Sequence, residues 1–475
     1  MTEKINGLSD SELDSLCDSA RARVLESDGV LDDADEQRLL ELLEAIEDKI
    51  TEYERLRLRL GRIVDYDRLK KKGFEASSLC EFDKEDGEYV ERIERYYADN
   101  LKKRLYMFGY PANMEDYSYA TGYLRHLESK MYLMNNCGDP YQKGNYGMDS
   151  KSTEKKIIKL VAENFGISEG NYWGYITSGG TESNFWGIRE GFNRLPAGKL
   201  YFSAETHYSV EKYVFDGERR DRYPYEIIPT DEHGRISVEA LIEAVKRDRE
   251  RGVKGAILVL TWGTTCHGVV DEVKKVTDSL RALGIDYYCH LDAAHFGGIA
   301  KNQKNAPYVD HLGELGVDSV AVSMHKFMGT ARVNGVLLAL SRRDRPVIDY
   351  IGQEDSTFLG SRDYLPFSTY QRAREMLLRR EPEHFCENVL YFEGKLRDAK
   401  IPFERFGSSN TFIIDKPSDE ICKKYQLATF VDPHGNHKAH IIIFPFHKKE
   451  IMDELVEDAR GDARGDARGD APYFL

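Results

Sequence analysis

The chain has 475 residues, of which 41% are hydrophobic and 31% charged, so it is long enough for two or three water-soluble domains. Its formal net charge of −15 argues against a nucleic-acid partner, and no apolar run is long enough to cross a membrane. The seven cysteines are scattered and include no CxxC pair, which predicts reduced thiols and no metal site. The N-terminus lacks the basic and then apolar segments of a signal peptide, so we expect a cytoplasmic protein.

Residues 1–75 are predicted to form a helical extension. Apolar residues recur there at alternating spacings of three and four, which is typical of a helix that packs on its own protein or on a partner subunit. A helix for self-association is the alternative. The stripe consists of Leu39, Leu43, Ile46, Ile50, Tyr53 and Leu60. The next segment, 76–150, becomes rich in Tyr, Asn, Gly and Asp from about residue 100, a composition that suits loops lining a polar site.

Residues 151–350 are predicted to form a large α/β domain. Short apolar runs alternate with amphipathic helical stretches, which favours a mostly parallel sheet covered on both faces. In such sheets, ligands bind beyond the strand ends. The runs lie at 199–205, 255–265, 287–294, 318–326 and 334–341, and the clearest helices at 237–252 and 271–285.

The alternation of short apolar runs with helical stretches ends before 351–458, where a smaller α+β domain is predicted. A long helical stretch, 368–399, precedes strand candidates at 410–416 and 439–446. Residues 459–475 repeat Arg-Gly-Asp-Ala without apolar side chains until the last three positions, so we expect a disordered tail. Adhesion through its RGD triplets is a poor alternative in a chain without a secretory signal.

Four short stretches carry candidate chemistry. Gly179 and Gly180 stand between a strand-like run and a helix, where backbone N–H groups could cradle a phosphate, although such a turn also caps helices for structural reasons. His207 follows the run at 199–205 and, taken alone, fits a structural role as well. Asp292 ends a buried run, where a carboxylate must be paired, solvated or used as a helix cap.

Lys326 ends the apolar run "SVAVSMHK", an unusual place for an amine unless it is condensed with an aldehyde. Together the four stretches describe the needs of pyridoxal 5′-phosphate. Its phosphate requires an anion cradle, its aldehyde a lysine, and its ring nitrogen a carboxylate. The joint pattern therefore predicts this cofactor, although no single stretch does.

Several motifs resemble one family over roughly residues 100–455. The chain is similar to the group II pyridoxal-phosphate-dependent amino-acid decarboxylases, in the branch that contains bacterial histidine decarboxylases and plant serine decarboxylases. The resemblance implies fold type I, the aspartate aminotransferase-like architecture, with a mostly parallel seven-stranded sheet and a small C-terminal α+β domain. The matching motifs are "GYPAN", "NNCGDP", "YWGYITSGGTESN", "THYSV", "GTTCHGVVDE", "HLDAA", "SVAVSMHKFMG", "GSRD" and "AHIIIFP".

The resemblance assigns catalytic roles to Lys326, which binds the cofactor as an imine, to Asp292, which pairs with its ring nitrogen, and to His207, which stacks on its ring. It also implies a homodimer with shared active sites, because the loop at 356–362 resembles one that enters the neighbouring subunit's site. Segment 76–150 is expected to contribute to the dimer and to the active site. The other implied cofactor-binding residues are Gly179, Gly180, Thr181, Glu182, Thr265, Ala294, Ser323, His325, Thr357, Gly360 and Ser361.

The implied reaction is the decarboxylation of an L-amino acid to its amine and CO₂, with His207 and a tyrosine as candidate proton donors. The chain departs from the family pattern at His295 and at the pair Asp363 and Tyr364. These departures favour histidine or a similar polar substrate, with serine next. The candidate substrate contacts are Tyr110, Asn113, His295 and Tyr364.

Two other readings remain open from the sequence. A different reaction on the same cofactor, such as oxidative decarboxylation with deamination, carbon–carbon lysis or desulfuration through Cys266, uses the same lysine and aspartate. A non-enzymatic scaffold that works through the N-terminal helix and the RGD tail predicts no cofactor at all.

Overall fold

The structure is a computed structural model, and it describes residues 102–114, 135–215, 223–298 and 312–463 apart from 343, 363, 379–380 and 433, with a few further residues between 92 and 100. The predicted helical extension, Asp363 and the tail beyond residue 463 lie outside these described residues. Residues 105–115 and 128–475 belong to one compact unit.

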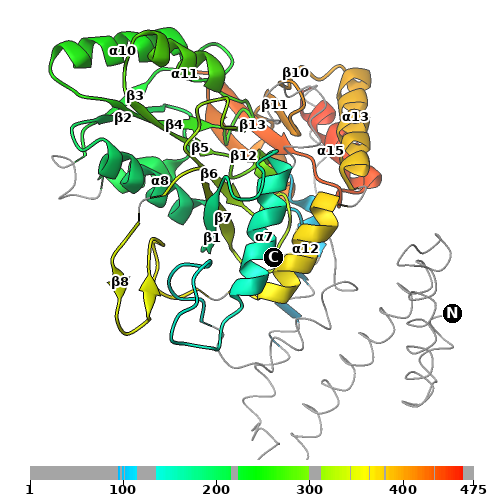
Figure 1. The fold of residues 1–475 in the computed structure, drawn as a ribbon. Helices are drawn as coiled ribbons and strands as arrows, with labels where there is room; N and C mark the ends of the chain where they lie inside the picture. Colours follow the sequence, from blue (N-terminus) through cyan, green and yellow to red (C-terminus); the bar gives the residue numbers. More distant parts are fainter. Residues whose placement is uncertain are drawn as a thin grey trace, which may run out of the picture. The chain divides into compact units, whose positions relative to one another are not determined.

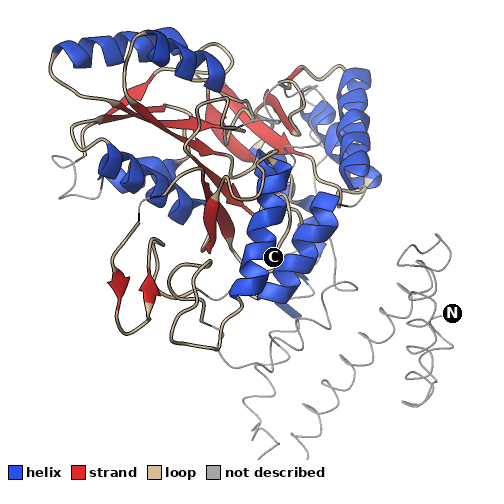
Figure 2. Cartoon of the chain, viewed as in Figure 1, coloured by secondary structure: helices blue, strands red, loops and turns tan. Residues whose placement is uncertain are grey.

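A seven-stranded sheet forms the centre of this unit (Figure 1; Figure 2). Its order is β1-β7-β6-β5-β4-β2-β3, and the five strands from β6 to β3 run parallel, whereas β7 is antiparallel to both neighbours. The predicted mostly parallel seven-stranded sheet is therefore confirmed. The strands are β1 (Trp173–Thr177), β2 (Lys199–Ser203), β3 (Tyr225–Ile228), β4 (Ala256–Thr261), β5 (Tyr287–Asp292), β6 (Ser319–Ser323) and β7 (Gly335–Ala339).

Helices cover both faces of the large sheet, which explains why β4, β6 and β7 are buried at every position. Figure 1 shows α10 and α11 together on one face and α8 across the other. The predicted helix at 237–252 begins at a cap: the Ser237 hydroxyl accepts a hydrogen bond from the backbone N–H of Ala240. The helices are α7 (Lys151–Asn164), α8 (Gly180–Arg194), α9 (Tyr208–Phe215), α10 (Val238–Glu250) and α11 (Val273–Ala282).

A smaller antiparallel sheet, of order β10-β11-β13-β12, forms the predicted C-terminal α+β part. The helices α13 and α15 pack against each other beside it (Figure 1). Its elements are β10 (Phe403–Glu404), β11 (Thr411–Asp415), β12 (Ala428–Val431), β13 (His437–Ile442), α13 (Glu381–Ala399), α14 (Asp419–Lys424) and α15 (Lys449–Ala463).

The predicted helical stretch at 368–399 is two helices, because α12 (Pro366–Leu378) ends before α13 begins. Helix α12 packs against α7 of the large part (Figure 1). The remaining short elements are the ribbon of β8 (Val347–Ile348) with β9 (Gln353–Glu354) and the 3₁₀ turns η1 (Arg104–Tyr106) and η3 (Phe296–Gly298).

The predicted disordered tail starts too early, because α15 continues through Ala463 and so contains its first five residues. Ala459 is buried, and the carboxylate of Asp462 accepts a hydrogen bond of 2.8 Å from the backbone N–H of Ser418. A four-residue repeat is close to one helical turn, so the first copy can extend a helix that already packs on its surroundings.

Residues 107–113 form a strap that joins the small sheet to the large one. The backbone of Phe108 donates to Tyr425 and accepts from Ile442, at 3.1 and 2.6 Å. At the other end, the backbone N–H of Asn113 donates to the carbonyl of Lys326 at 2.7 Å. A Cβ at Gly109 would stand 2.3 Å from the backbone of the small sheet, so only glycine allows this approach.

His447 fixes the strap through both ring nitrogens. Its Nδ1 accepts from the backbone N–H of Phe444 at 3.0 Å, and its Nε2 therefore carries the proton that it donates to the carbonyl of Met107 at 3.1 Å. The ring also stacks on Phe108 with 4.1 Å between centroids. Burial lowers the pKa of His447 to about 3, because a charged imidazolium would lose its water shell there.

This lowered pKa predicts a pH-dependent stability. The unfolded chain binds a proton at residue 447 below about pH 6.5 and the folded chain does not, so stability is complete above that pH and falls as the pH drops toward about 3. One such histidine contributes a slope of about 1.4 kcal/mol per pH unit. The buried His290 and His295, with pKa values lowered to about 4 and about 3, add slopes of the same sign.

His447→Gln cannot take up a proton. Between about pH 7 and about pH 5, we expect its unfolding free energy to depend less on pH, by roughly the slope that one histidine contributes. Chemical denaturation at several pH values measures this slope separately from any overall loss of stability. His434→Gln, at an exposed turn, is the matched control and should keep the wild-type slope. An unchanged slope in His447→Gln would contradict the assignment.

Candidate active site

Lys326 lies three residues beyond β6, at the sheet edge where the parallel strands end. Its backbone N–H bonds to the carbonyl of Ser323 and its own carbonyl accepts from Asn113, so the turn is held at both ends. The side chain lines a cavity. Burial lowers the pKa of the Lys326 amine, and the negative charge of Asp292 opposes this change. A lowered pKa increases the neutral fraction of the amine, which is the nucleophilic form.

Asp292 ends β5 at the same edge, because β5 and β6 are paired in parallel with Asp292 opposite Ala321. The carboxylate is 3% exposed and both of its oxygens accept hydrogen bonds. Oδ2 accepts from Asn184 Nδ2 at 2.8 Å, and Oδ1 accepts from the backbone N–H of Ala294 at 3.0 Å. These contacts satisfy the predicted need of a carboxylate in this position and fix its orientation.

Asn184, on α8, orients several of the surrounding groups and was not predicted as a site residue. Its Nδ2 donates to Asp292 and to Ser209 Oγ, the latter at 2.9 Å, and its Oδ1 accepts from His290 Nε2 at 3.1 Å. All of its hydrogen-bonding groups are used inside the protein. Asn184 stands one helical turn after Gly180, a spacing that could have indicated a side chain beneath the cradle.

His207 lines the cavity from the turn before α9. Its Nδ1 accepts from the backbone N–H of Ser209 at 3.3 Å and lies 2.8 Å from Ser209 Oγ, so the proton of the neutral ring resides on Nε2. Burial and, to a lesser degree, the positive charge of Lys326 lower the pKa of His207, whereas Asp292 opposes them. The ring is therefore neutral at physiological pH.

The glycine turn predicted as a phosphate cradle precedes α8. Gly179 has a φ of 128°, and the backbone N–H of Gly180 donates to Ser323 Oγ at 3.1 Å. A Cβ at Gly180 would lie 2.6 Å from that hydroxyl and collide with it, so glycine allows the turn to approach Ser323 closely. The first N–H groups of α8 at Thr181 and Glu182 have no partner within the helix, which suits an anion.

Two predicted cradle residues are held by neighbouring groups. The Glu182 carboxylate accepts from the hydroxyl of Tyr175 at 2.9 Å and from the backbone N–H of Ser178 at 2.7 Å, so it braces the turn. A carboxylate has no proton to give to a phosphate, and only the backbone N–H of Glu182 fits the predicted role. His325 Nδ1 donates to the carbonyl of Asn334 at 2.9 Å, beside Gly179.

The cavity brings together six predicted residues: Lys326, Asp292, His207, Ala294, His295 and Thr265. The strap and the small sheet also contribute. Segment 76–150, which includes the strap, was expected to reach the site, and Pro111 and Ile442 lie in the motifs "GYPAN" and "AHIIIFP", but neither was predicted as a site residue. The lining residues that were not predicted are Pro111, Thr261, Gly263, Thr264, Thr411 and Ile442.

Other predicted residues lie outside the lining of this cavity. Tyr110 is 53% exposed, and Asn113 reaches the site only through its backbone bond to Lys326. Tyr364 is buried elsewhere, with its hydroxyl accepting from Asn136 Nδ2 at 3.3 Å, and this packing does not support the predicted substrate contact. Thr357, Gly360 and Ser361 are on the 356–362 loop, where Ser361 Oγ accepts from Asn135.

Cys266, the cysteine considered for desulfuration, does not line the cavity. Burial, together with the nearby charge of Glu205, raises the pKa of its thiol to about 12. A thiol with such a pKa is protonated at neutral pH and is a poor nucleophile.

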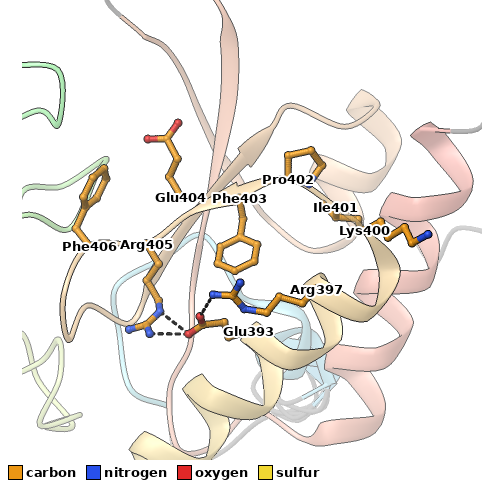
Figure 3. A pocket seen from close by; sticks show the side chains of 9 residues that line it. All are labelled: Glu393, Arg397, Lys400, Ile401, Pro402, Phe403, Glu404, Arg405 and Phe406. Atoms are coloured by element: carbon orange, nitrogen blue, oxygen red, sulfur yellow. Dashed lines mark hydrogen bonds and ion pairs between the residues drawn. The ribbon is translucent and has the colours of Figure 1, made fainter.

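A second hollow, of about 690 Å³, lies between the end of α13 and β10 (Figure 3). The Glu393 carboxylate accepts there from both Arg405 and Arg397, so all three side chains are held in ion pairs. Its nine lining residues include no histidine or cysteine, and it has none of the chemistry found around Lys326.

Within the part of the chain that the structure describes, no helix has the length and apolar character required to span a bilayer. The same residues contain no group of three or more histidine, cysteine or acidic side chains placed to hold a metal ion.

The residues present fit pyridoxal 5′-phosphate. The glycine turn brings the Ser323 hydroxyl beside the N-terminus of α8, where hydroxyl and backbone N–H groups can bind a phosphate. A lysine amine with a lowered pKa and a fixed, buried carboxylate stand in the same cavity. These groups match the phosphate, the aldehyde and the ring nitrogen of the cofactor.

Comparison with known proteins agrees with this geometry. Residues 195–364 match the pyridoxal-dependent decarboxylase conserved domain. A histidine decarboxylase of Pseudomonas entomophila is 33% identical over 382 residues, which are 77% of this chain and 89% of that protein. One from Acinetobacter baumannii is 30% identical over 384 residues, 78% of this chain and 94% of that protein.

Among solved structures, the internal aldimine form of L-methionine decarboxylase from a Streptomyces species has the same fold. Its TM-score is 0.66 at 21% identity, with 79% of this chain and 96% of that chain covered. This likeness supports the fold-type I assignment, and the sequence relatives support the chemistry. On these grounds the chain belongs to the pyridoxal-dependent decarboxylase family.

Proposed function

We propose that this pyridoxal-phosphate-dependent decarboxylase converts L-histidine, or a polar amino acid of similar size, to its amine and CO₂. The main support for this reaction is that Lys326, Asp292 and His207 line the same cavity. The substrate class is supported by two relatives named histidine decarboxylase and by the imidazole and hydroxyl groups in the lining, which include His295, Thr261 and Thr411.

The bound cofactor supplies an aldehyde that captures the substrate amine and a ring that withdraws electrons from the bond to the carboxylate. Lys326 holds the cofactor, since burial keeps part of its amine neutral and reactive. Asp292 presents its charge to the ring nitrogen, and an ion pair at about 4 Å contributes roughly 4 kcal/mol at an effective dielectric of about 20. Asn184 and the Ala294 backbone keep that carboxylate in place.

His207 is the proposed group that stacks on the cofactor ring and handles a proton. Ser209 holds its Nδ1, so Nε2–H is the bond from which a proton can move. A neutral ring at physiological pH can both give that proton and recover it. No tyrosine lines the cavity among the described residues, so the predicted second donor is not found among them.

We also propose a homodimer in which the 356–362 loop completes the neighbouring subunit's site. Thr357, Gly360 and Ser361 do not line the cavity of their own chain. Leu359 is 42% exposed, and a Cβ at Gly360 would meet no atom within 4 Å. The loop resembles a cofactor-binding loop, but its tip at 359–361 is exposed in its own chain, and a second copy would explain that exposure.

A cytoplasmic location is proposed as well. Cys137, Cys266, Cys289 and Cys422 are free thiols. Free thiols are typical of proteins in a reducing compartment.

Lys326→Ala should abolish CO₂ release, by at least about a thousandfold, because no other amine in the described lining can take its place. The fold should persist, since the change removes an amine that is costly to bury. Borohydride treatment of the wild type should remove the visible absorbance and leave the cofactor attached to Lys326 in peptide mapping. Lys246→Ala, at an exposed position, is the control, and substantial turnover by Lys326→Ala would refute the assignment.

Asp292→Asn should lower turnover by about a hundredfold or more, because the amide carries no charge for the ring nitrogen. Its stability should fall by only about 1 kcal/mol, since an amide has one oxygen where the carboxylate accepts with two. Assays of CO₂ release and thermal unfolding of the loaded enzyme measure the two effects. A variant that is unstable but fully active per folded molecule would contradict the role.

Gly360→Trp should inactivate the dimer without disturbing its own chain, because the new ring enters open space there. Mixed with Lys326→Ala under conditions of subunit exchange, it should recover up to about a quarter of wild-type activity, since half of the dimers then hold one intact site. Gly394→Trp, also at an open position, should stay active. Inactive mixtures despite proven exchange would argue against shared sites.

A further inference from the structure

Two buried polar atoms on the wall of the active-site cavity have no hydrogen-bond partner: His295 Nδ1 and Thr261 Oγ1. His295 is 7% exposed and Thr261 is 3% exposed. Buried polar atoms are nearly always paired, because an unpaired one loses its bonds to water without replacement. Two such atoms in the lining of one cavity indicate a site prepared for a polar ligand.

The tautomer of His295 follows from its neighbours. Asn410 Nδ2 donates to the carbonyl of Ile443 at 2.9 Å, which fixes the orientation of the amide. Asn410 Oδ1 then faces His295 Nε2 at 3.1 Å and can only accept. The single proton of the neutral imidazole therefore resides on Nε2, and Nδ1 presents a bare lone pair.

The ring is also held in place and kept neutral. It packs against Phe296, with centroids 4.9 Å apart, and edge-on against Phe444 at 5.9 Å. Burial and the nearby Lys326 lower the pKa of His295 to about 3. Near neutral pH, Nδ1 is thus a fixed acceptor that cannot become a donor.

We propose that His295 Nδ1 accepts a hydrogen bond from the substrate side chain and thereby selects amino acids that carry an N–H or O–H group there. This inference rests on the proposed function and deepens it, because it names the chemical feature by which the site recognises its substrate. Thr261 Oγ1, which can donate as well as accept, serves a second polar atom of the same ligand. A side chain without a donor leaves Nδ1 unpaired, and sites of this type discriminate strongly for that reason.

The test compares L-histidine with β-(2-thienyl)-L-alanine, a five-membered ring of similar size that has no N–H. For the loaded wild-type enzyme we expect kcat/KM to favour histidine by at least about tenfold. His295→Phe, which keeps an aromatic ring but has no acceptor, should reduce that preference to about parity, because it lowers kcat/KM for histidine more than for the thienyl substrate. His295→Gln keeps a donor toward Asn410 and an acceptor toward the cavity, and it should restore part of the preference.

A binding measurement independent of turnover accompanies the kinetics. Calorimetric titration with the product amines, histamine and 2-(2-thienyl)ethylamine, should show the same loss of preference in His295→Phe and the same partial recovery in His295→Gln. Preserved preference in His295→Phe, in either measurement, would overturn the role of His295. Wild-type enzyme that releases no CO₂ from histidine would instead refute the proposed substrate, and the failure of both amines to bind would refute both proposals.

Discussion

The site depends on one constraint: a carboxylate at the buried end of β5 must be satisfied without losing its charge. Asn184 and the backbone of Ala294 meet this need by donating to the two oxygens of Asp292. Because the same amide also bonds Ser209 and His290, fixing Asp292 fixes the groups around it. A carboxylate suited to the role proposed for Asp292 is therefore held in place by α8 and the sheet of the protein itself.

The second requirement is closure of the cavity by the small sheet. Thr411 and Ile442 come from β11 and β13, and Pro111 comes from the strap, which is bonded to β13 through Ile442. The strap reaches the lysine turn through the bond from Asn113 to Lys326, so the packing of the small part is linked to the position of the reactive amine. Gly109 is needed where the strap crosses the sheet, because any side chain would collide with backbone atoms.

Three buried neutral histidines make different hydrogen bonds in this structure. His447 uses both ring nitrogens to hold the strap, and His290 joins Asn184 to Ser319 at 2.7 Å. His295 uses only Nε2, which makes its free Nδ1 exceptional among the three. The same burial that lowers their pKa values keeps them useful as neutral donors and acceptors at physiological pH.

The sequence by itself determined the chemistry and the large sheet. Lys326, Asp292 and His207 follow strand-forming runs, and the ends of parallel strands meet at one edge, so local order was enough to bring them together. Only the tertiary structure decided which side chains surround them. Thr411 carries no motif, Asn184 ends one without being predicted as a site residue, and Tyr364, next to another, packs between other elements. Side-chain neighbours are set by packing across the chain and not by spacing along it.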